Sequence, residues 1–292
     1  DMLLVGAIQP NMIIAAALGA EFVFSDDRDS DVKGFPLKDI KDAGDLPEVS
    51  EVLELPFIKN LARQFSDAVH SYPDCRVIPP FFWDTSGRAT IHGIITTSMK
   101  FIGQEIFTMM MSEPGLVKGI HSWITDVYIG LIRHFSDLGR LPVTMVHVGE
   151  CSGAMLDEYS YREFVTPFLS RIGRELGAVR LHSCGNSDHV MDPVCEIENL
   201  KIIDSGSNTS IAAIRKRRGR DFQIDIFPPV EILVEGSKTG DMEEWLERTL
   251  KDNDGGRLKI AYHLEPDYNL SNCIYIHEEL HKRGLVKKGR IY

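Results

Sequence analysis

The sequence predicts an α/β protein, a single-domain (β/α)8 or TIM barrel, on two observations. Short apolar segments bounded by Gly, Pro, Asp or charged residues alternate along the 292 residues with longer segments in which apolar residues recur every three or four positions. The short segments are typical of buried parallel strands, and the long ones of helices that pack one face on a sheet. Eight short segments can be counted, which is the number of strands that a barrel needs.

The expected strands follow one another at intervals that leave room for a helix between most of them. They are residues 2–7, 21–24, 76–81, 143–148, 178–182, 201–204, 222–226 and 259–264. The first two have the least regular pattern, and residues 2–7 could also belong to an incomplete helix. Because the chain begins with Asp1 rather than Met, we expect the barrel domain, residues 1–292, to be shortened at its N-terminus.

The expected helices have apolar residues spaced three and four apart, and several begin at residues that cap helices well. They are residues 57–71, 116–138, 160–176, 188–196, 210–218, 242–252 and 270–283. We find no internal repeat, and residues 34–47 and 236–240 resemble ordinary surface loops. One domain is therefore the economical interpretation.

Composition excludes several classes of protein. A net charge of −11 argues against a nucleic-acid partner, and the basic run at residues 215–220 is interpreted as the solvated end of a helix. No apolar run approaches the roughly 20 residues that span a bilayer, so no membrane partner is expected. The five cysteines are odd in number and irregular in spacing, which favours a reducing, cytoplasmic environment over a disulfide framework.

A soft-metal motif stands where an expected strand gives way to an expected helix. His182 and Cys184 are separated by one residue and followed by Gly185 and Asn186. Imidazole and thiolate are the usual donors to zinc, and the carboxyl end of a parallel strand is where barrel proteins carry their chemistry. A pair of this kind also occurs by chance, because a free cysteine is most often a small buried apolar residue.

Further polar side chains stand at the ends of other expected strands, where a barrel would bring them to one mouth. They are Glu150, Asp204, Asp225, His263 and Glu265. Acids and histidines in such positions need partners, and a metal ion would provide one. His92, His121, His134 and His147 have no evident partners in the sequence and are interpreted as structural or surface residues.

Two motifs carry a resemblance to a known family. Residues 149–156, followed by Tyr161-Arg162-Glu163-Phe164-Val165-Thr166-Pro167, resemble the E-F-V-x-P segment of the uroporphyrinogen decarboxylase superfamily. Residues 181–186 resemble the H-x-C-G-N zinc motif of its corrinoid-linked methyltransferase branch. Segments 86–117 and 261–283 also agree, so the resemblance covers roughly residues 15–285.

The resemblance implies a barrel that binds Zn²⁺ through His182, Cys184 and a third ligand after the last strand. We expect His263 as that ligand and Glu150 as a fourth or exchangeable one, while Cys151 and Cys273 are interpreted as packed thiols. Glu150 and His182 are the expected catalytic residues. The chain has no D-x-H-x-x-G motif, so the cobalamin that exchanges the methyl group would be supplied by a separate corrinoid protein.

Aromatic side chains near the expected mouth favour an aryl methyl ether among the small methylated substrates. The expected pocket residues are Phe82, Trp83, Asp84, Asp225 and Phe227. A thiol or folate as methyl acceptor stays open, as does a homodimer. A decarboxylase is the alternative within the superfamily, because residues 24–26 resemble its F-S-D segment, but no arginine clamp of the Q-A-G-R-Y type is present. A non-catalytic subunit that binds the corrinoid protein is the alternative from another class.

Overall fold

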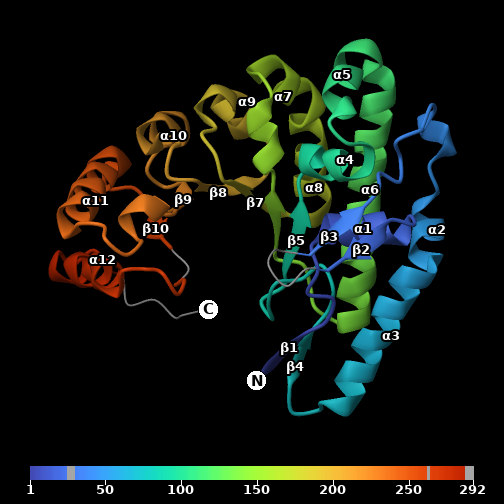
Figure 1. The fold of residues 1–292 in the computed structure, drawn as a ribbon, viewed down its shortest axis with the longest axis horizontal. Helices are drawn as coiled ribbons and strands as arrows, with labels where there is room; N and C mark the ends of the chain where they lie inside the picture. Colours follow the sequence, from blue (N-terminus) through green and yellow to red (C-terminus); the bar gives the residue numbers. More distant parts are fainter. Residues whose placement is uncertain (25–29, 262–263, 287–292) are drawn as a thin grey trace.

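The computed structural model describes residues 1–24, 30–261 and 264–286, and within them the chain folds as a (β/α)8 barrel. Six parallel strands pair in chain order and form an arc with helices on its outer side (Figure 1). They are β5 (Arg88–His92), β6 (Met145–Gly149), β7 (Ala178–Ser183), β8 (Leu200–Ser205), β9 (Gln223–Ile226) and β10 (Leu258–Ile260). The two other parallel strands, β1 (Met2–Leu4) and β4 (Arg76–Ile78), pair with each other.

The expected second barrel strand is wrong. Residues 21–24 contribute β2 (Glu21–Val23), which forms an antiparallel pair with β3 (Asp31–Lys33) outside the barrel. Its place among the parallel strands is taken by β5, which the sequence pattern did not identify. Ala89 and Thr90 at the centre of β5 are small or polar, so the strand lacks the apolar run that marks the others.

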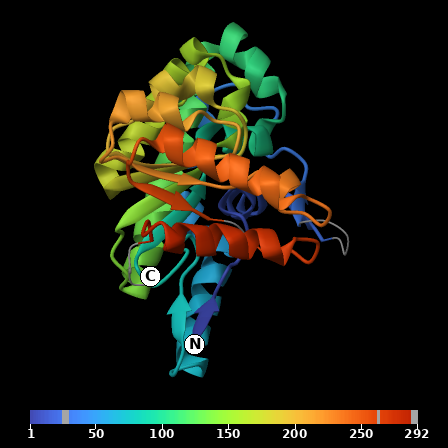
Figure 2. The ribbon, with the colours of Figure 1, turned by 90° about the vertical axis from the view of Figure 1, so that its left-hand side faces the viewer.

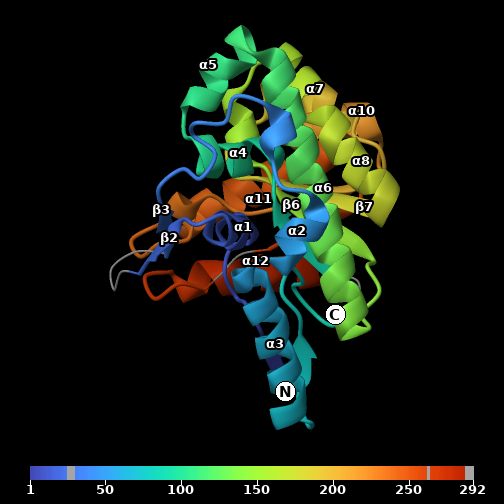
Figure 3. The same cartoon turned by 90° about the vertical axis from the view of Figure 1, so that its right-hand side faces the viewer.

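Helices make up much of the rest of the described residues. They are α1 (Pro10–Ala17), α2 (Val49–Glu54), α3 (Pro56–Ser71), α4 (Ile94–Ile102), α5 (Glu105–Ser112), α6 (Pro114–Gly139), α7 (Glu158–Phe164), α8 (Thr166–Leu176), α9 (Met191–Cys195), α10 (Ile211–Arg218), α11 (Thr239–Asn253) and α12 (Leu270–Lys282). Short 3-10 helices lie at Ala43–Asp45, Cys151–Met155, Asp188–Val190 and Val230–Ile232. Helices α11 and α12 lie side by side (Figure 2), and α3 lies beside β4 and near the N-terminus (Figure 3).

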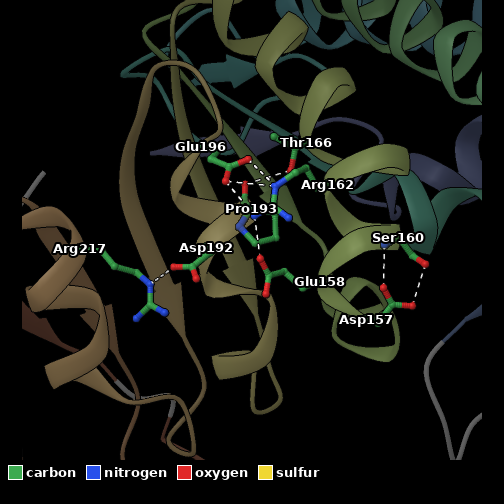
Figure 4. A network of polar contacts seen from close by, with 9 residues as sticks. All are labelled: Asp157, Glu158, Ser160, Arg162, Thr166, Asp192, Pro193, Glu196 and Arg217. Atoms are coloured by element: carbon green, nitrogen blue, oxygen red, sulfur yellow. Dashed lines mark hydrogen bonds and ion pairs between the residues drawn. The ribbon is translucent and has the colours of Figure 1, made fainter.

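The segment expected as one helix over residues 160–176 is divided into α7 and α8. Pro167 has no backbone N–H to continue the hydrogen bonds of α7, but it suits the first turn of α8. Polar contacts join these helices to their neighbours (Figure 4): Arg162 bonds Glu158 and Glu196, and the Thr166 hydroxyl donates to the Pro193 carbonyl. The break therefore lets two short helices follow the curve of the barrel.

The basic run at residues 215–220 ends α10, as expected, but it is only partly solvated: Lys216, Arg217 and Arg220 are exposed, whereas Arg215 is buried. Arg215 is 7% exposed and donates to Asn253 Oδ1 and to the carbonyls of Phe222 and Arg257. Arg217 pairs with Asp192 across the gap to α9. These side chains connect α10 to the elements on both sides of it, so the run is structural. Among the described residues, no helix has the length and apolar character needed to cross a membrane.

The strand register places polar residues in one row across the six-stranded sheet. The residues paired in this row, from β5 to β10, are His92, Gly149, His182, Asp204, Asp225 and Lys259. Side chains at positions i and i+2 of a strand share a face, so residues two positions further along face the same side. The row therefore fixes where the side chains after β6 and β7 meet.

Candidate metal centre

Three metal-ligating side chains meet at the carboxyl ends of β6 and β7. The ligand atoms of Cys151, His182 and Cys184 all lie within 4.8 Å of one another. Cys184 Sγ is 3.1 Å from Cys151 Sγ and 3.0 Å from His182 Nε2. Since Gly149 pairs with His182 in the register, the residues two positions beyond each of them also become neighbours. Two thiols and an imidazole are a donor set that suits zinc, and three protein ligands are typical of a catalytic zinc site.

A carboxylate orients the imidazole of this group. His182 Nδ1 is 2.8 Å from Asp204 Oδ2, so the other ring nitrogen, Nε2, is left to face the two thiols. Arg180 lies 2.9 Å from the same Asp204 oxygen, and Asp204 is buried. A histidine that binds metal commonly has such a carboxylate on its second nitrogen, where it fixes the tautomer and ring orientation.

The two thiols, which are joined by a hydrogen bond, differ in pKa. The hydrogen bond from Cys151 lowers the pKa of Cys184 to about 7. The same bond, with burial, raises the pKa of Cys151 to about 12. Burial opposes the charged form of His182, but the hydrogen bonds with Asp204 and Cys151 outweigh it and raise the pKa of the imidazole to about 9. Cys184 is therefore the thiol that most readily becomes a thiolate, the form that binds metal.

The structure does not bring Glu150 into this group. Its carboxylate oxygens accept hydrogen bonds from the backbone N–H groups of Ile95 at 3.0 Å and Thr96 at 3.1 Å, in the first turn of α4. Burial raises the pKa of Glu150 to about 7, although these bonds favour the carboxylate. Glu150 therefore caps α4 and is not part of the ligand group, and its expected catalytic role stays a prediction.

The alternation of side chains along β6 explains why Cys151, rather than Glu150, joins the group. His147 and Gly149 face the inside of the barrel, whereas Val146 and Val148 are fully buried on the other side. Cys151 continues the inward series, and Glu150 continues the outward one. This signal was present in the sequence, and it contradicts the interpretation of Cys151 as a packed thiol.

A cavity of about 880 Å³ lies beside the candidate metal centre. Cys151 and His182 line it, together with residues of β5, α4 and the N-terminal segment before α1. Phe82 and Trp83, two of the expected pocket residues, also line it. A volume of this size is typical of a small-molecule site, so the three ligand side chains face a space in which a substrate can bind.

Asp84, Asp225 and Phe227 are not among the described residues that line this cavity. Asp84 accepts bonds from Ser86 and Arg88 within a turn, and Asp225 is buried against Arg180. Phe227 packs edge-on against His182, with ring centres 6.4 Å apart, and lines a separate pocket with Cys184. His263 lies outside the described residues, and Cys273 is buried in α12.

His147, interpreted from the sequence as structural or surface, belongs to the wall of the cavity. Its Nδ1 lies 2.8 Å from Arg180 Nη1, and its ring packs edge-on against Trp83 with centres 4.9 Å apart. Burial and the nearby Arg180 lower the pKa of His147 to about 3. The ring is therefore neutral at physiological pH.

Gly206, after β8, permits the close packing that holds Cys184 in place. A Cβ at this position would lie 1.9 Å from the Cys184 carbonyl oxygen, far inside contact distance. Only glycine fits without moving one of the two backbones. The Gly206 N–H also donates to the Ser183 carbonyl at 2.8 Å, so the loops after β7 and β8 support each other.

Comparison with known proteins agrees with this architecture. One solved structure with a similar fold is described as a methyltransferase from Methanosarcina mazei; it is 12% identical, with a TM-score of 0.64, and the match covers 96% of this chain and 81% of that one. No curated protein matches the sequence. The family model for uroporphyrinogen decarboxylase (URO-D) matches residues 10–226, from the first turn of α1 to the end of β9. The chain therefore belongs to the uroporphyrinogen decarboxylase family.

Proposed function

We propose that this chain is a zinc-dependent methyltransferase. It takes a methyl group from a small methylated compound, for which an aryl methyl ether is favoured, and passes it to the cobalamin of a separate corrinoid protein. The observation that carries the proposal is the meeting of Cys151, His182 and Cys184 beside a cavity large enough for such a compound. The similarity in fold to a protein described as a methyltransferase supports it.

The roles of the residues follow from their contacts. When bound, zinc would act as a Lewis acid that draws charge from the ether oxygen as the bond between that oxygen and the methyl carbon breaks. Cys184, with its lowered pKa, would hold the metal as a thiolate, and Cys151 and His182 would supply the two other donors. Asp204 holds the His182 ring so that Nε2 faces the site. Phe82 and Trp83, which line the cavity, would pack against the ring of the bound ether.

The charges around the cavity favour this proposal over decarboxylation of a porphyrinogen, a substrate with several carboxylates. Among the described residues that line the cavity, Lys100 is the one lysine or arginine, and it forms an ion pair with Asp31 at 2.5 Å. Binding several carboxylates requires several cationic partners. Metal ligands would also have no role in a reaction that uses no metal.

The metal content of the purified protein tests the first half of the proposal. We expect about one zinc per chain by elemental analysis, because three protein donors make a catalytic-type site. Cys151→Ala and Cys184→Ala should each lose the metal while retaining cooperative unfolding, and Cys75→Ala is the matched control that should retain it. Zinc at the wild-type level in both Cys151→Ala and Cys184→Ala would refute the metal assignment.

Reconstituted methyl transfer tests the second half. Loss of the cob(I)alamin absorbance should require this chain, a methylated aromatic compound and the corrinoid protein together. Cys184→Ala should abolish the reaction, and Cys75→Ala should support it at the wild-type rate. Equal consumption of cob(I)alamin without this chain, or with Cys184→Ala, would show that the proposed reaction does not depend on the site.

A further inference from the structure

Two histidines stand one turn apart on α12. The segment His277-Glu278-Glu279-Leu280-His281 has the H-E-x-x-H pattern, in which two imidazoles on one face of a helix can bind one metal ion. Residues four positions apart are neighbours on a helix surface. The rings of His277 and His281 do meet: their centres are 4.4 Å apart, and their planes are inclined at 66°. The helix therefore brings two nitrogen donors to one place.

The helix turns this pair away from the rest of the protein. The buried side of α12 consists of Asn272, Cys273 and Ile276. A second side contacts α11, which lies beside it (Figure 2), and there Arg283 pairs with Glu247. His277 and His281 are on the remaining side, and both are exposed. In the described part of the chain, neither ring has a hydrogen-bond partner, so both are free to bind an ion from solution.

The charges around the pair are compatible with a bound cation. His281 is in the last turn of α12, where the free backbone carbonyls place partial negative charge. The two basic residues that follow it are paired with acids: Lys282 with Glu279, and Arg283 with Glu279 and Glu247. A divalent ion at the histidine pair would therefore meet less repulsion than the sequence of this turn suggests.

The pair differs from a metalloprotease site in the number of ligands. Such a site adds a third protein ligand, and the glutamate of the motif then acts on a metal-bound water. Among the described residues, the one group of three metal-ligating side chains is Cys151, His182 and Cys184. The site on α12 thus has two protein donors, which suits ion binding rather than hydrolysis. Imidazole favours Ni²⁺, Cu²⁺ and Zn²⁺, whereas Mg²⁺ and Ca²⁺ favour oxygen ligands.

We propose that the histidine pair of α12 is a further metal site, which binds a divalent transition-metal ion through one imidazole nitrogen of His277 and one of His281. This site is independent of the proposed methyl transfer. Two donors hold an ion less tightly than three, so zinc would fill the group around Cys184 first. Dialysis would then remove the ion from the histidine pair and leave the other site loaded.

Calorimetric titration with Ni²⁺ tests the site, on protein that has been given one equivalent of zinc and then desalted. We expect a binding event that His277→Ala and His281→Ala each weaken at least about 10-fold, because the second donor on the same helix acts at a high effective concentration. Alanine is the best helix former, so both variants should unfold as the wild type does. Mg²⁺ should give no such event.

Two controls separate a paired site from the mere number of histidines. His70→Ala removes a lone exposed histidine from the end of α3 and should bind Ni²⁺ as the wild type does. Glu278→His in the His281→Ala background keeps two histidines but places them next to each other in sequence, where they do not face each other on a helix, so it should not restore binding. No Ni²⁺ binding by the wild type, or wild-type affinity in both His277→Ala and His281→Ala, would overturn the proposal.

Discussion

At the scale of single residues, the ligand set depends on which way each side chain leaves its strand. The motif of His182 and Cys184 was evident in the sequence because two metal-binding residues stood one position apart. Cys151 was not, because it stands beside Glu150, and a buried acid resembles a ligand as much as a thiol does. Glu150 and Cys151 can be distinguished only by the alternation of side chains along β6, where His147 and Gly149 face the inside of the barrel.

Asp204 should control metal affinity without touching the metal. Asp204→Asn replaces the carboxylate that accepts from His182 Nδ1 and Arg180 with an amide, which cannot stabilise both donors. We expect zinc affinity, measured by competition with a chromophoric chelator, to fall about 10–100-fold. Asp192→Asn, which alters a surface pair with Arg217, is the control. Unchanged affinity in Asp204→Asn would mean that His182 is oriented by other contacts.

At the scale of elements, the segments best predicted from the sequence were those with a strong periodic pattern. Helices α3, α6 and α12 were anticipated to within a few residues, as were strands β6 to β9. No expected helix covers α1, α2, α4 or α5. Other elements were missed or altered for identifiable reasons: β5 because its centre is Ala and Thr, β2 because a short apolar segment looks the same in a hairpin as in a barrel, and α7 with α8 because Pro167 divides them. In each case tertiary pairing or a single proline decided the outcome.

His121, a buried histidine of α6 that contacts the end of α7, should make the stability of the fold sensitive to acid. His121 Nδ1 lies 2.8 Å from the Phe164 carbonyl, and burial lowers the pKa of His121 from 6.5 to about 4. Between these values the unfolded chain binds the proton and the folded chain does not, so stability falls as the pH decreases through this window. From the difference in pKa, we expect His121 to account for roughly 2 kcal/mol of lost unfolding free energy at pH 5 relative to pH 7.5.

Denaturant unfolding at these two pH values checks the prediction. His121→Phe should lose less stability on acidification than the wild type, because the group that titrates has been removed. His134→Phe, on the same helix, is the control and should show the wild-type loss. An equal pH dependence in His121→Phe and the wild type would place the acid sensitivity elsewhere.

At the scale of the whole molecule, the barrel and the end of it that carries the candidate metal centre were predictable, whereas the cavity was not. Strand ends can be read from a sequence, since each is a local pattern. The cavity depends on the position of the N-terminal segment and α1 against β5, contacts between residues about 80 positions apart, and no local pattern reports them. That Asn11 and His92 both line this cavity could not have been predicted for this reason.

Metal binding should stabilise the entire barrel, because Cys151 and Cys184 belong to different βα units. Zinc at a free concentration 1,000 times its Kd would add about 4 kcal/mol to the unfolding free energy. We expect a chelator to lower the Tm of the purified protein by several degrees, and added zinc to restore it. Cys184→Ala should show neither shift. A chelator effect of equal size in that variant would indicate a metal site other than this one.

The size of the residue at position 149 determines how much space is left inside the barrel at this point. Gly149 is the member of the sheet-wide row that has no side chain, its φ is not positive, and a Cβ placed there would make only ordinary contacts, 3.9 Å from Ile91 O and 4.0 Å from His92 Cδ2. Larger residues would thus be accommodated by the backbone while occupying the space between His92 and His182. Descendants of this chain could exchange bulky methyl donors for compact ones by a single substitution at Gly149, keeping Cys151, His182 and Cys184 intact. The chemistry and the choice of substrate are then separately evolvable within one scaffold.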